Sequence, residues 1–314
     1  MTSMAPVPPR LTVHLMGGLG NQLFQYAFGR MLAHANGAEL LLDASGYETY
    51  GPENPERGVR ACGLQHFNIA GRIVGGQHAP ASPWMDLQRK AGKSGRLLRR
   101  LLDLPRPYYL RQEIDEPKGN YFRFDPRVCA RTFQGALSVR GFWQTEKYFK
   151  RIEPLLRGEL RWRTALPRGD AALAGLIEQS ISVGIHVRHG DNAGVAAALG
   201  VLPTQYYAGA VRQLGQQFPE ASFFVFSDDI EWAKVVLPGN LRRTLMPRNR
   251  GGRDHEDLRL MSLCKHHVIA NSTFSWWGAW LGKKPGQIVY APRRYYQNID
   301  RPNPDLYPKD WRLI

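Results

Sequence analysis

The second half of the chain alternates between short apolar segments and segments with helical spacing, and this pattern constrains the fold more than any other feature. Strands that alternate regularly with helices form a parallel sheet wrapped by helices. The predicted strands are residues 182–187, 222–227, 241–246, 267–271 and 287–292, and the predicted helices are residues 203–218, 254–265 and those that begin at 230 and 272.

The start of the chain shows the same pattern once. Residues 11–16 are predicted as a strand, apolar residues then repeat at helical spacing from Leu23 to Ala35, and residues 39–43 are predicted as the next strand. The pattern breaks up between residues 46 and 140, and helical character returns at 144–160. We therefore predict two α/β domains that face a cleft, residues 10–160 and residues 161–314.

The charge of the chain indicates anionic partners. The formal net charge is +15 over 314 residues, which suits a nucleotide-linked substrate, an acidic lipid or a nucleic acid. Three cysteines without paired spacing indicate neither a disulfide framework nor a zinc site. The N-terminus lacks a signal peptide and no apolar run is long enough to span a membrane, so we predict a cytoplasmic protein.

One strand ends abruptly in charged side chains. After the apolar residues that begin at Ser182 come His186, Arg188 and Asp191. In open α/β sheets, ligands bind beyond the carboxyl ends of the strands. A guanidinium makes two-pronged contacts that suit phosphate, so Arg188 predicts a site for a phosphorylated ligand. The alternative is an Arg–Asp pair that closes a turn.

A glycine-rich loop, Gly17-Gly-Leu-Gly-Asn-Gln22, lies between the first strand and the first helix. Gly18 and Gly20 fit the first two glycines of a dinucleotide site, with Asp43 placed for a ribose contact, but Leu23 takes the place of the third glycine. The amides of Asn21 and Gln22 suit a sugar or a phosphate instead. A purely structural turn is the third alternative.

Two further strand ends carry polar residues at helix starts. Asn271 or Ser272 would cap the helix that follows, where backbone N–H groups and the helix dipole bind anions, although capping alone explains the hydroxyls. The paired tryptophans 276 and 277 are predicted to be core. Asp228 and Asp229 could hold a divalent ion, contact a ribose or only cap the helix at Ile230.

The basic run at residues 87–102 is most simply a solvated helix face. Peripheral contact with anionic membrane, at the inner face, is its alternative. A nucleic-acid-binding module would show a basic stripe interleaved with exposed aromatics. Here most aromatics lie inside periodic elements, so no nucleic-acid partner is predicted. His266 and His267 are adjacent and do not share a helix face, so no metal site is predicted there.

Taken together, several motifs in order closely resemble the bacterial α-1,2-fucosyltransferases. The resemblance extends over nearly the whole chain and is loosest between residues 46 and 140. The matching segments are residues 17–27, His-Val-Arg-His-Gly-Asp at 186–191, residues 201–207, Phe-Ser-Asp-Asp-Ile-Glu-Trp at 226–232, residues 260–281, Gly-Phe-Trp-Gln-Thr-Glu-Lys-Tyr-Phe at 141–149 and residues 305–311.

The resemblance implies a GT-B fold, in which two Rossmann-like domains face a cleft. It implies that GDP-fucose binds mainly to the C-terminal domain and the acceptor mainly to the N-terminal one. The implied reaction is metal-independent and inverting: L-fucose moves from GDP-β-L-fucose to a galactose 2-hydroxyl of an oligosaccharide or surface glycan. A rival class is an NAD(P)-dependent oxidoreductase that uses the Gly18 loop.

Residue roles follow from the resemblance as well. Arg188 resembles the residue that grips the leaving β-phosphate, with His186 beside it, and Asp257 the acid that reads guanine. The group at the helix start that binds the phosphates is Ser272, Thr273 and Phe274.

Asn21 with its flanking glycines resembles the N-domain loop that closes over donor and acceptor. This chain has His189 where the family usually has a second Arg. Fucosyl transfer builds negative charge on GDP, and preorganised donors such as Arg188 stabilise it. Asp191 would accept the proton of the acceptor hydroxyl, or would orient Arg188 or His186.

Overall fold

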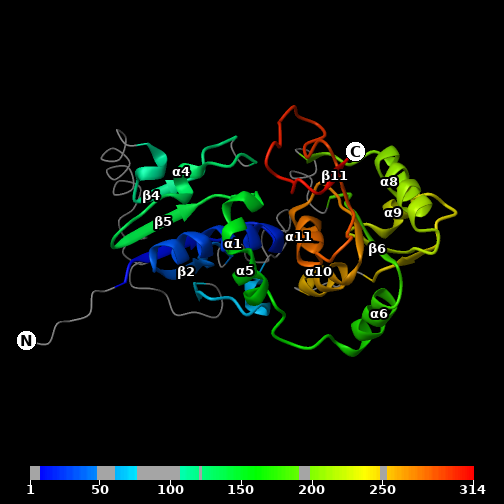
Figure 1. Cartoon of the computed structure of the whole chain (residues 1–314), viewed down its shortest axis with the longest axis horizontal. Coiled ribbons are helices and arrows are strands. Elements are labelled where there is room, and N and C mark those ends of the chain that lie inside the picture. The colour runs from blue at the N-terminus through cyan, green and yellow to red at the C-terminus, as the bar shows by residue number, and fades with distance from the viewer. Residues whose placement is uncertain (1–7, 48–60, 76–106, 120–121, 191–198, 248–252) are drawn as a thin grey trace, which may run out of the picture.

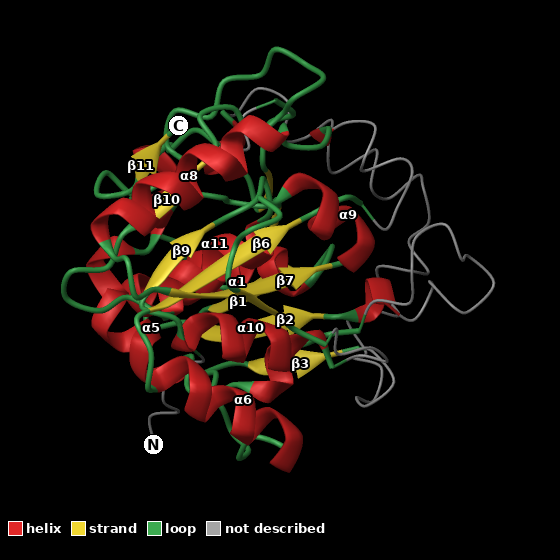
Figure 2. Ribbon diagram, turned by 90° about the vertical axis from the view of Figure 1, so that its right-hand side faces the viewer, coloured by secondary structure: helices red, strands yellow, loops and turns green. Residues whose placement is uncertain are grey.

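The computed structural model describes residues 8–47, 61–75, 107–119, 122–190, 199–247 and 253–314. These residues form two parallel β-sheets, each flanked by helices. Figure 1 shows the N-terminal sheet on the left and the C-terminal half on the right, with helices α1 and α11 next to each other where the halves meet. In the turned view of Figure 2, strands of both sheets are seen together in the middle of the molecule.

The N-terminal sheet has the strand order β3-β2-β1-β5-β4. The chain runs outward from β1 through β2 to β3, and then places β5 on the opposite side of β1. Its strands are β1 Arg10–His14, β2 Glu39–Asp43, β3 Arg72–Val74, β4 Glu113–Asp115 and β5 Ala136–Arg140. The strand order therefore reverses between β1 and β5, and ligands bind at such a reversal in open α/β sheets.

The C-terminal sheet has the strand order β11-β10-β9-β6-β7-β8 and reverses between β6 and β9. All six residues of the central strand β6 are buried, as expected for a parallel strand covered on both faces. The strands are β6 Ser182–Val187, β7 Ser222–Ser227, β8 Arg243–Leu245, β9 His266–Val268, β10 Val289–Ala291 and β11 Arg312–Leu313.

Helices of very different length connect these strands. The α-helices are α1 Leu19–Asn36, α4 Pro126–Cys129, α5 Glu153–Glu159, α6 Arg168–Glu178, α8 Thr204–Gln217, α9 Ile230–Val236, α10 Asp254–Leu263 and α11 Thr273–Leu281. The 3-10 turns include η1 Ser45–Tyr47, η3 Leu64–His66, η4 Tyr108–Leu110, η5 Glu146–Tyr148 and η6 Lys150–Ile152. None of the helices in the described ranges is both long and apolar enough to cross a bilayer.

The predicted strands 39–43, 182–187 and 222–227 are confirmed with the same bounds. The helix predicted at 144–160 is wrong in its first half, where two 3-10 turns precede α5. Strands β3, β4 and β5 lie in the region between 46 and 140 where the sequence showed no regular pattern. β3 and β4 have only three residues each and contain charged residues, which leaves little apolar signal. The domain boundary at 160/161 stays a prediction.

An aromatic core joins α1 to α11. The ring of Phe24 lies 4.5 Å from that of Trp276 and 5.1 Å from that of Trp277, and Phe149 stacks on Trp277 at 5.6 Å. Trp276 and Trp277 are fully buried, so their prediction as core is confirmed. Aromatic contacts of this kind bury large apolar areas and add favourable ring geometry. The first turns of α1 and α11 are thus held in a fixed relation.

Candidate active site

The first turns of α1 and α11 meet at the reversal points of the two sheets. A Cβ atom on Gly20 would lie 2.5 Å from the carbonyl carbon of Thr273 and 2.6 Å from the backbone nitrogen of Phe274. Only a glycine permits this approach of two backbones. Gly20 therefore serves the contact between helix α1 and helix α11. The positive N-terminal ends of two helices thus lie close together, which favours an anion there.

The loop before α1 is fastened by side chains. Gly17 has a φ of 77°, a conformation that glycine adopts without strain. Its carbonyl accepts a hydrogen bond from the Tyr47 hydroxyl at 2.8 Å and from Gln22 Nε2 at 3.2 Å. Gln22 is fully buried; its Nε2 also donates to the Ala61 carbonyl, and its Oε1 accepts from the Gly63 N–H. Gln22 therefore holds the loop, which corrects its prediction as a ligand contact.

Gly18 takes the N-cap position of α1, where its backbone is extended and no side chain caps the helix. Its carbonyl accepts from the backbone N–H of Asn21 at 2.9 Å and of Gln22 at 3.1 Å. Asn21 reaches across to α11: its Oδ1 accepts a hydrogen bond from the Thr273 hydroxyl at 3.0 Å. Gly18 and Asn21 thus stand at the junction of the two helices.

Arg188 follows β6 and Ser272 follows β9, so the two residues stand on either side of the C-terminal reversal point. Arg188 Nη1 donates to Ser272 Oγ over 3.4 Å. Ser272 is the N-cap of α11, because its hydroxyl oxygen accepts from the Phe274 N–H at 3.3 Å. The capping prediction for Ser272 is confirmed. Both of these bonds use the Ser272 oxygen as acceptor, so among the described residues the hydroxyl proton is left to donate to a ligand oxygen.

His186 lies inside β6 rather than at its tip. It is 8% exposed, and its ring centroid is 5.9 Å from that of Phe274. The prediction that it projects into a crevice does not hold, since residues of a central parallel strand are covered on both faces. We place it beneath the first turn of α11.

The two aspartates after β7 have different tasks. Asp228 accepts from the backbone N–H of His189 at 2.8 Å and of Gly190 at 2.9 Å, and so shapes the loop after β6. Asp229 caps α9 by accepting from the Trp232 N–H at 3.0 Å. That bond and the His189 imidazole lower the pKa of Asp229. The capping prediction is confirmed for Asp229, whereas the carboxylate of Asp228 is occupied by the loop.

The remaining predicted residues differ in position. Asn271 is 1% exposed, and its Nδ2 donates to the carbonyls of Leu199, Gly200 and Tyr295, so it braces loops behind the site rather than facing a ligand. Asp257 lies in the first turn of α10 and is partly exposed. Asp191 and the basic run 87–102 lie outside the described residues.

A row of hydrogen-bonded side chains that the sequence did not indicate crosses three neighbouring strands, β2, β1 and β5. His14 Nδ1 lies 2.8 Å from Asp43 Oδ2, and His14 Nε2 lies 2.8 Å from Ser138 Oγ. Burial raises the pKa of Asp43, but the hydrogen bonds from His14 and Ser45 outweigh burial and lower it. The Asp43 carboxylate thus accepts hydrogen bonds from its own neighbours. It does not serve the ribose contact that a dinucleotide site would need.

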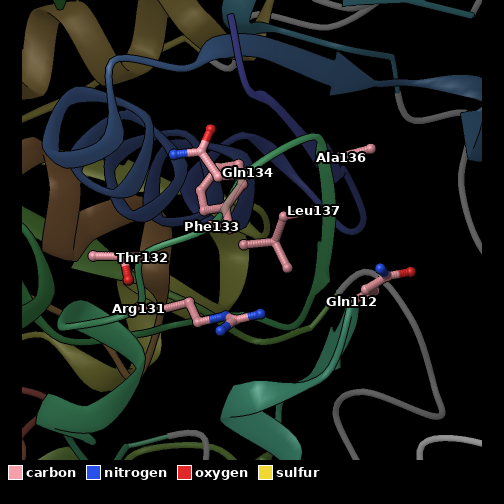
Figure 3. Close-up of a pocket in the computed structure, with 7 residues that line it drawn as sticks. All are labelled: Gln112, Arg131, Thr132, Phe133, Gln134, Ala136 and Leu137. Carbon is pink, nitrogen blue, oxygen red and sulfur yellow. The ribbon is translucent and has the colours of Figure 1, made fainter.

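A hollow of about 320 Å³ lies elsewhere, at the amino ends of β5 and β4. Figure 3 shows the Arg131 side chain reaching toward Leu137 and Gln112 across this hollow. Ligands of parallel sheets bind at the carboxyl ends of the strands, which is the opposite end of this sheet. We therefore do not include the hollow in the candidate site.

Two parallel sheets, each flanked by helices and meeting through α1 and α11, correspond to the GT-B fold of glycosyltransferases. The chain belongs to glycosyl transferase family 11, because the sequence model of that family matches residues 101–314. It is 30% identical over 308 residues to an alpha-1,2-colitosyltransferase of Escherichia coli, covering 97% of this chain and 98% of that relative.

A mammalian relative and a solved structure extend the comparison. The galactoside 2-alpha-L-fucosyltransferase Sec1 of Mus musculus is 25% identical over 319 residues, covering 96% of this chain and 72% of that relative. A mutant of Arabidopsis thaliana FUT1 in complex with GDP superposes with a TM-score of 0.52 at 14% identity, covering 96% and 73% of the two chains. The GT-B fold and the family resemblance are confirmed, and the oxidoreductase alternative is wrong.

Proposed function

We propose that this enzyme transfers L-fucose from GDP-β-L-fucose to the 2-hydroxyl of a galactose-terminated glycan and forms an α-1,2 linkage with inversion. One observation carries the proposal: in a family 11 glycosyltransferase, Arg188 and the first turns of α1 and α11 converge where the two sheets reverse. This arrangement offers positive charge and N–H donors to a diphosphate.

In the proposed reaction, the acceptor oxygen attacks C1 of fucose while the bond from C1 to the β-phosphate oxygen breaks, and its electron pair leaves with GDP. Arg188 and the Ser272 hydroxyl then donate to oxygens whose negative charge is growing. Preorganised donors stabilise such a transition state more than the ground state. These donors can stabilise the negative charge of the phosphates without a divalent ion.

The nucleoside and acceptor ends of the site complete the proposal. Asp257, in the first turn of α10, would accept hydrogen bonds from guanine. His186, which packs against Phe274, would position the first turn of α11 that binds the phosphates. Asp191 follows the loop that Asp228 fastens, and we propose it as the group that takes the acceptor proton or that orients Arg188.

A second candidate for the transferred sugar is colitose. It is favoured by the Escherichia coli relative named alpha-1,2-colitosyltransferase, which matches over nearly the full length of both chains. Both candidates share the proposed site and linkage.

The test is a matrix of donors and acceptors. The purified protein is incubated with GDP-fucose or GDP-colitose and with β-galactosides, and the product linkage is determined by NMR. We expect an α-1,2-linked product in the presence of EDTA. Loss of transfer with EDTA and recovery with magnesium would reassign Asp228 and Asp229 as metal ligands. No transfer from any GDP-sugar would overturn the proposed function.

A further inference from the structure

The side-chain amide of Asn21 receives a hydrogen bond from each half of the molecule. Gln144 Nε2 donates to Asn21 Oδ1 at 2.9 Å, and the Thr273 hydroxyl donates to the same oxygen at 3.0 Å. Gln144 follows β5 and Asn21 follows β1, so they come from the two sides of the N-terminal reversal point. Gln144 is 6% exposed and is separated from Asn21 by 123 positions in the sequence.

These two bonds orient the amide. A carbonyl oxygen accepts two hydrogen bonds, whereas an NH₂ group only donates. With Oδ1 directed at Gln144 and Thr273, Nδ2 lies on the other side, where a Cβ on Gly17 would come within 2.3 Å of it. Within the described ranges Asn21 Nδ2 has no acceptor on the protein, and Asn21 is partly exposed. Among the described residues, both N–H groups of this amide are therefore left to donate to a ligand.

The backbone around Gln144 is held rigidly. Trp143 has a φ of 53°, a conformation that costs energy for a residue other than glycine and persists where the surroundings enforce it. Glu116 accepts from the N–H groups of Phe142 at 2.6 Å and of Trp143 at 3.3 Å, and the Trp143 ring stacks on Phe28 at 4.2 Å. Gln144 thus extends from an anchored segment toward Asn21.

We propose that Gln144 is a positioning residue that fixes the Asn21 amide with Oδ1 toward Thr273 and Nδ2 on the Gly17 side, so that Nδ2 donates a hydrogen bond to a diphosphate oxygen of the donor nucleotide. The inference rests on the proposed function. It gives a role to the segment 141–149, which the family resemblance singled out without assigning one. It also commits the Thr273 hydroxyl proton to Asn21.

Three substitutions test the orientation. Gln144→Leu removes the donor and Gln144→Glu replaces it with an acceptor, which favours a turned Asn21 amide with its oxygen toward the ligand. We expect both to lower kcat/KM and to weaken GDP binding by about tenfold, the value of one hydrogen bond to a charged group. Asn21→Asp keeps the acceptor for Gln144 and Thr273 but presents a carboxylate oxygen to phosphate. It should cost about 100-fold at an unchanged melting temperature.

The matched control is Gln213→Glu on α8, where the side-chain oxygen accepts from the Tyr290 hydroxyl and a carboxylate preserves that bond. It should leave GDP binding and kcat/KM unchanged. A double-mutant cycle separates positioning from a general structural role. If Gln144 acts through Asn21, Gln144→Leu should have no further effect on GDP affinity in an Asn21→Ala background.

Three results would overturn the inference. Wild-type GDP affinity in both Gln144 variants would show that the bond positions nothing. An undiminished effect of Gln144→Leu in the Asn21→Ala background would show that Gln144 acts elsewhere. Tolerance of Gln144→Glu with a loss in Gln144→Leu would show that the amide is turned the other way. Failure of the wild-type protein to bind GDP would instead overturn the proposed function itself.

Discussion

The two sheets reverse their strand order at facing points, yet they furnish different chemistry there. The C-terminal reversal point provides a guanidinium and a hydroxyl, Arg188 and Ser272. The N-terminal one provides a glycine that lets α1 touch α11 and an amide, Gly20 and Asn21. We infer that the C-terminal side binds phosphate charge and that the N-terminal side sets how closely and in which orientation the halves meet. Substitutions on the two sides should therefore fail in different ways.

The largest effect is expected from Arg188→Lys. Lysine keeps the charge but does not reproduce the two-pronged grip on phosphate, so kcat/KM should fall by about two to three orders of magnitude. The measurement is steady-state transfer from GDP-fucose with the melting temperature recorded alongside. The melting temperature should stay within a few degrees of wild type.

The neighbouring His189→Ala serves as the control for that substitution. The His189 side chain is 44% exposed and its ring stacks on Trp232 at 4.6 Å, away from the Arg188–Ser272 bond. The fall in kcat/KM should be much smaller in His189→Ala than in Arg188→Lys. Equal losses in the two variants, or a large drop in melting temperature for Arg188→Lys, would make Arg188 a structural residue.

The next largest effect tests the N-terminal side. Gly20→Ala places a methyl group 2.5 to 2.7 Å from backbone atoms of Thr273 and Phe274, so the helices must move apart. A displacement of this size should cost roughly 100-fold in kcat/KM, with a lower melting temperature. Gly209→Ala is the matched control, because it lies within α8 with no atom within 4 Å of the added methyl. It should be neutral or slightly stabilising.

A smaller effect is expected on the C-terminal side from Ser272→Ala. The change removes the N-cap of α11 and the acceptor for Arg188, and should lower the free energy of unfolding by about 1 kcal/mol. Activity should fall by roughly tenfold through the lost hydroxyl donor. Ser262→Ala on α10 removes a hydroxyl bonded to the Arg259 carbonyl and controls for hydroxyl loss alone. Equal activity in Ser272→Ala and Ser262→Ala would show that the Ser272 hydroxyl does not donate to the phosphate.

The smallest effect on activity is expected at Glu116, which holds the backbone next to Gln144 and should make the free energy of unfolding depend on pH. Burial raises the pKa of the Glu116 carboxyl to about 7, from 4.5 for a free carboxyl. Between these values the folded state holds a proton that the unfolded state releases, so the free energy of unfolding falls as pH rises from about 4.5 through 7. Glu116→Gln should flatten that slope in urea denaturation series at pH 5 and pH 7.5. An identical slope in the variant would contradict this assignment.

The strand ends of the C-terminal half were predictable because its central strands β6 and β7 are mainly apolar. Both strands end at the predicted residues, and Arg188 and Asp228 follow at once. The short strands β3 and β4 carry exposed charges within three residues and leave no comparable signal. Their place in the sheet comes from pairing with β2 and β5, which are distant in the sequence.

Polar residues were harder to assign than strands. Gln22, Asn271 and Asp43 have the side chains that a ligand site needs, but the fold uses them to hold loops and His14. A sequence shows which side chains can donate or accept hydrogen bonds. It does not show which of them bond to the protein's own backbone and side chains instead of a ligand. The bond from Gln144 to Asn21 spans the chain from β5 to α1, and no local pattern indicates it.

The most direct test of the central claim compares GDP and GMP by isothermal titration calorimetry. If Arg188 grips the β-phosphate where the two helices meet, the wild-type protein should bind GDP at least about tenfold more tightly than GMP. Arg188→Lys should abolish most of that difference while GMP affinity stays near wild type. Equal affinity of the wild-type protein for GDP and GMP, or a difference that survives in Arg188→Lys, would contradict the account.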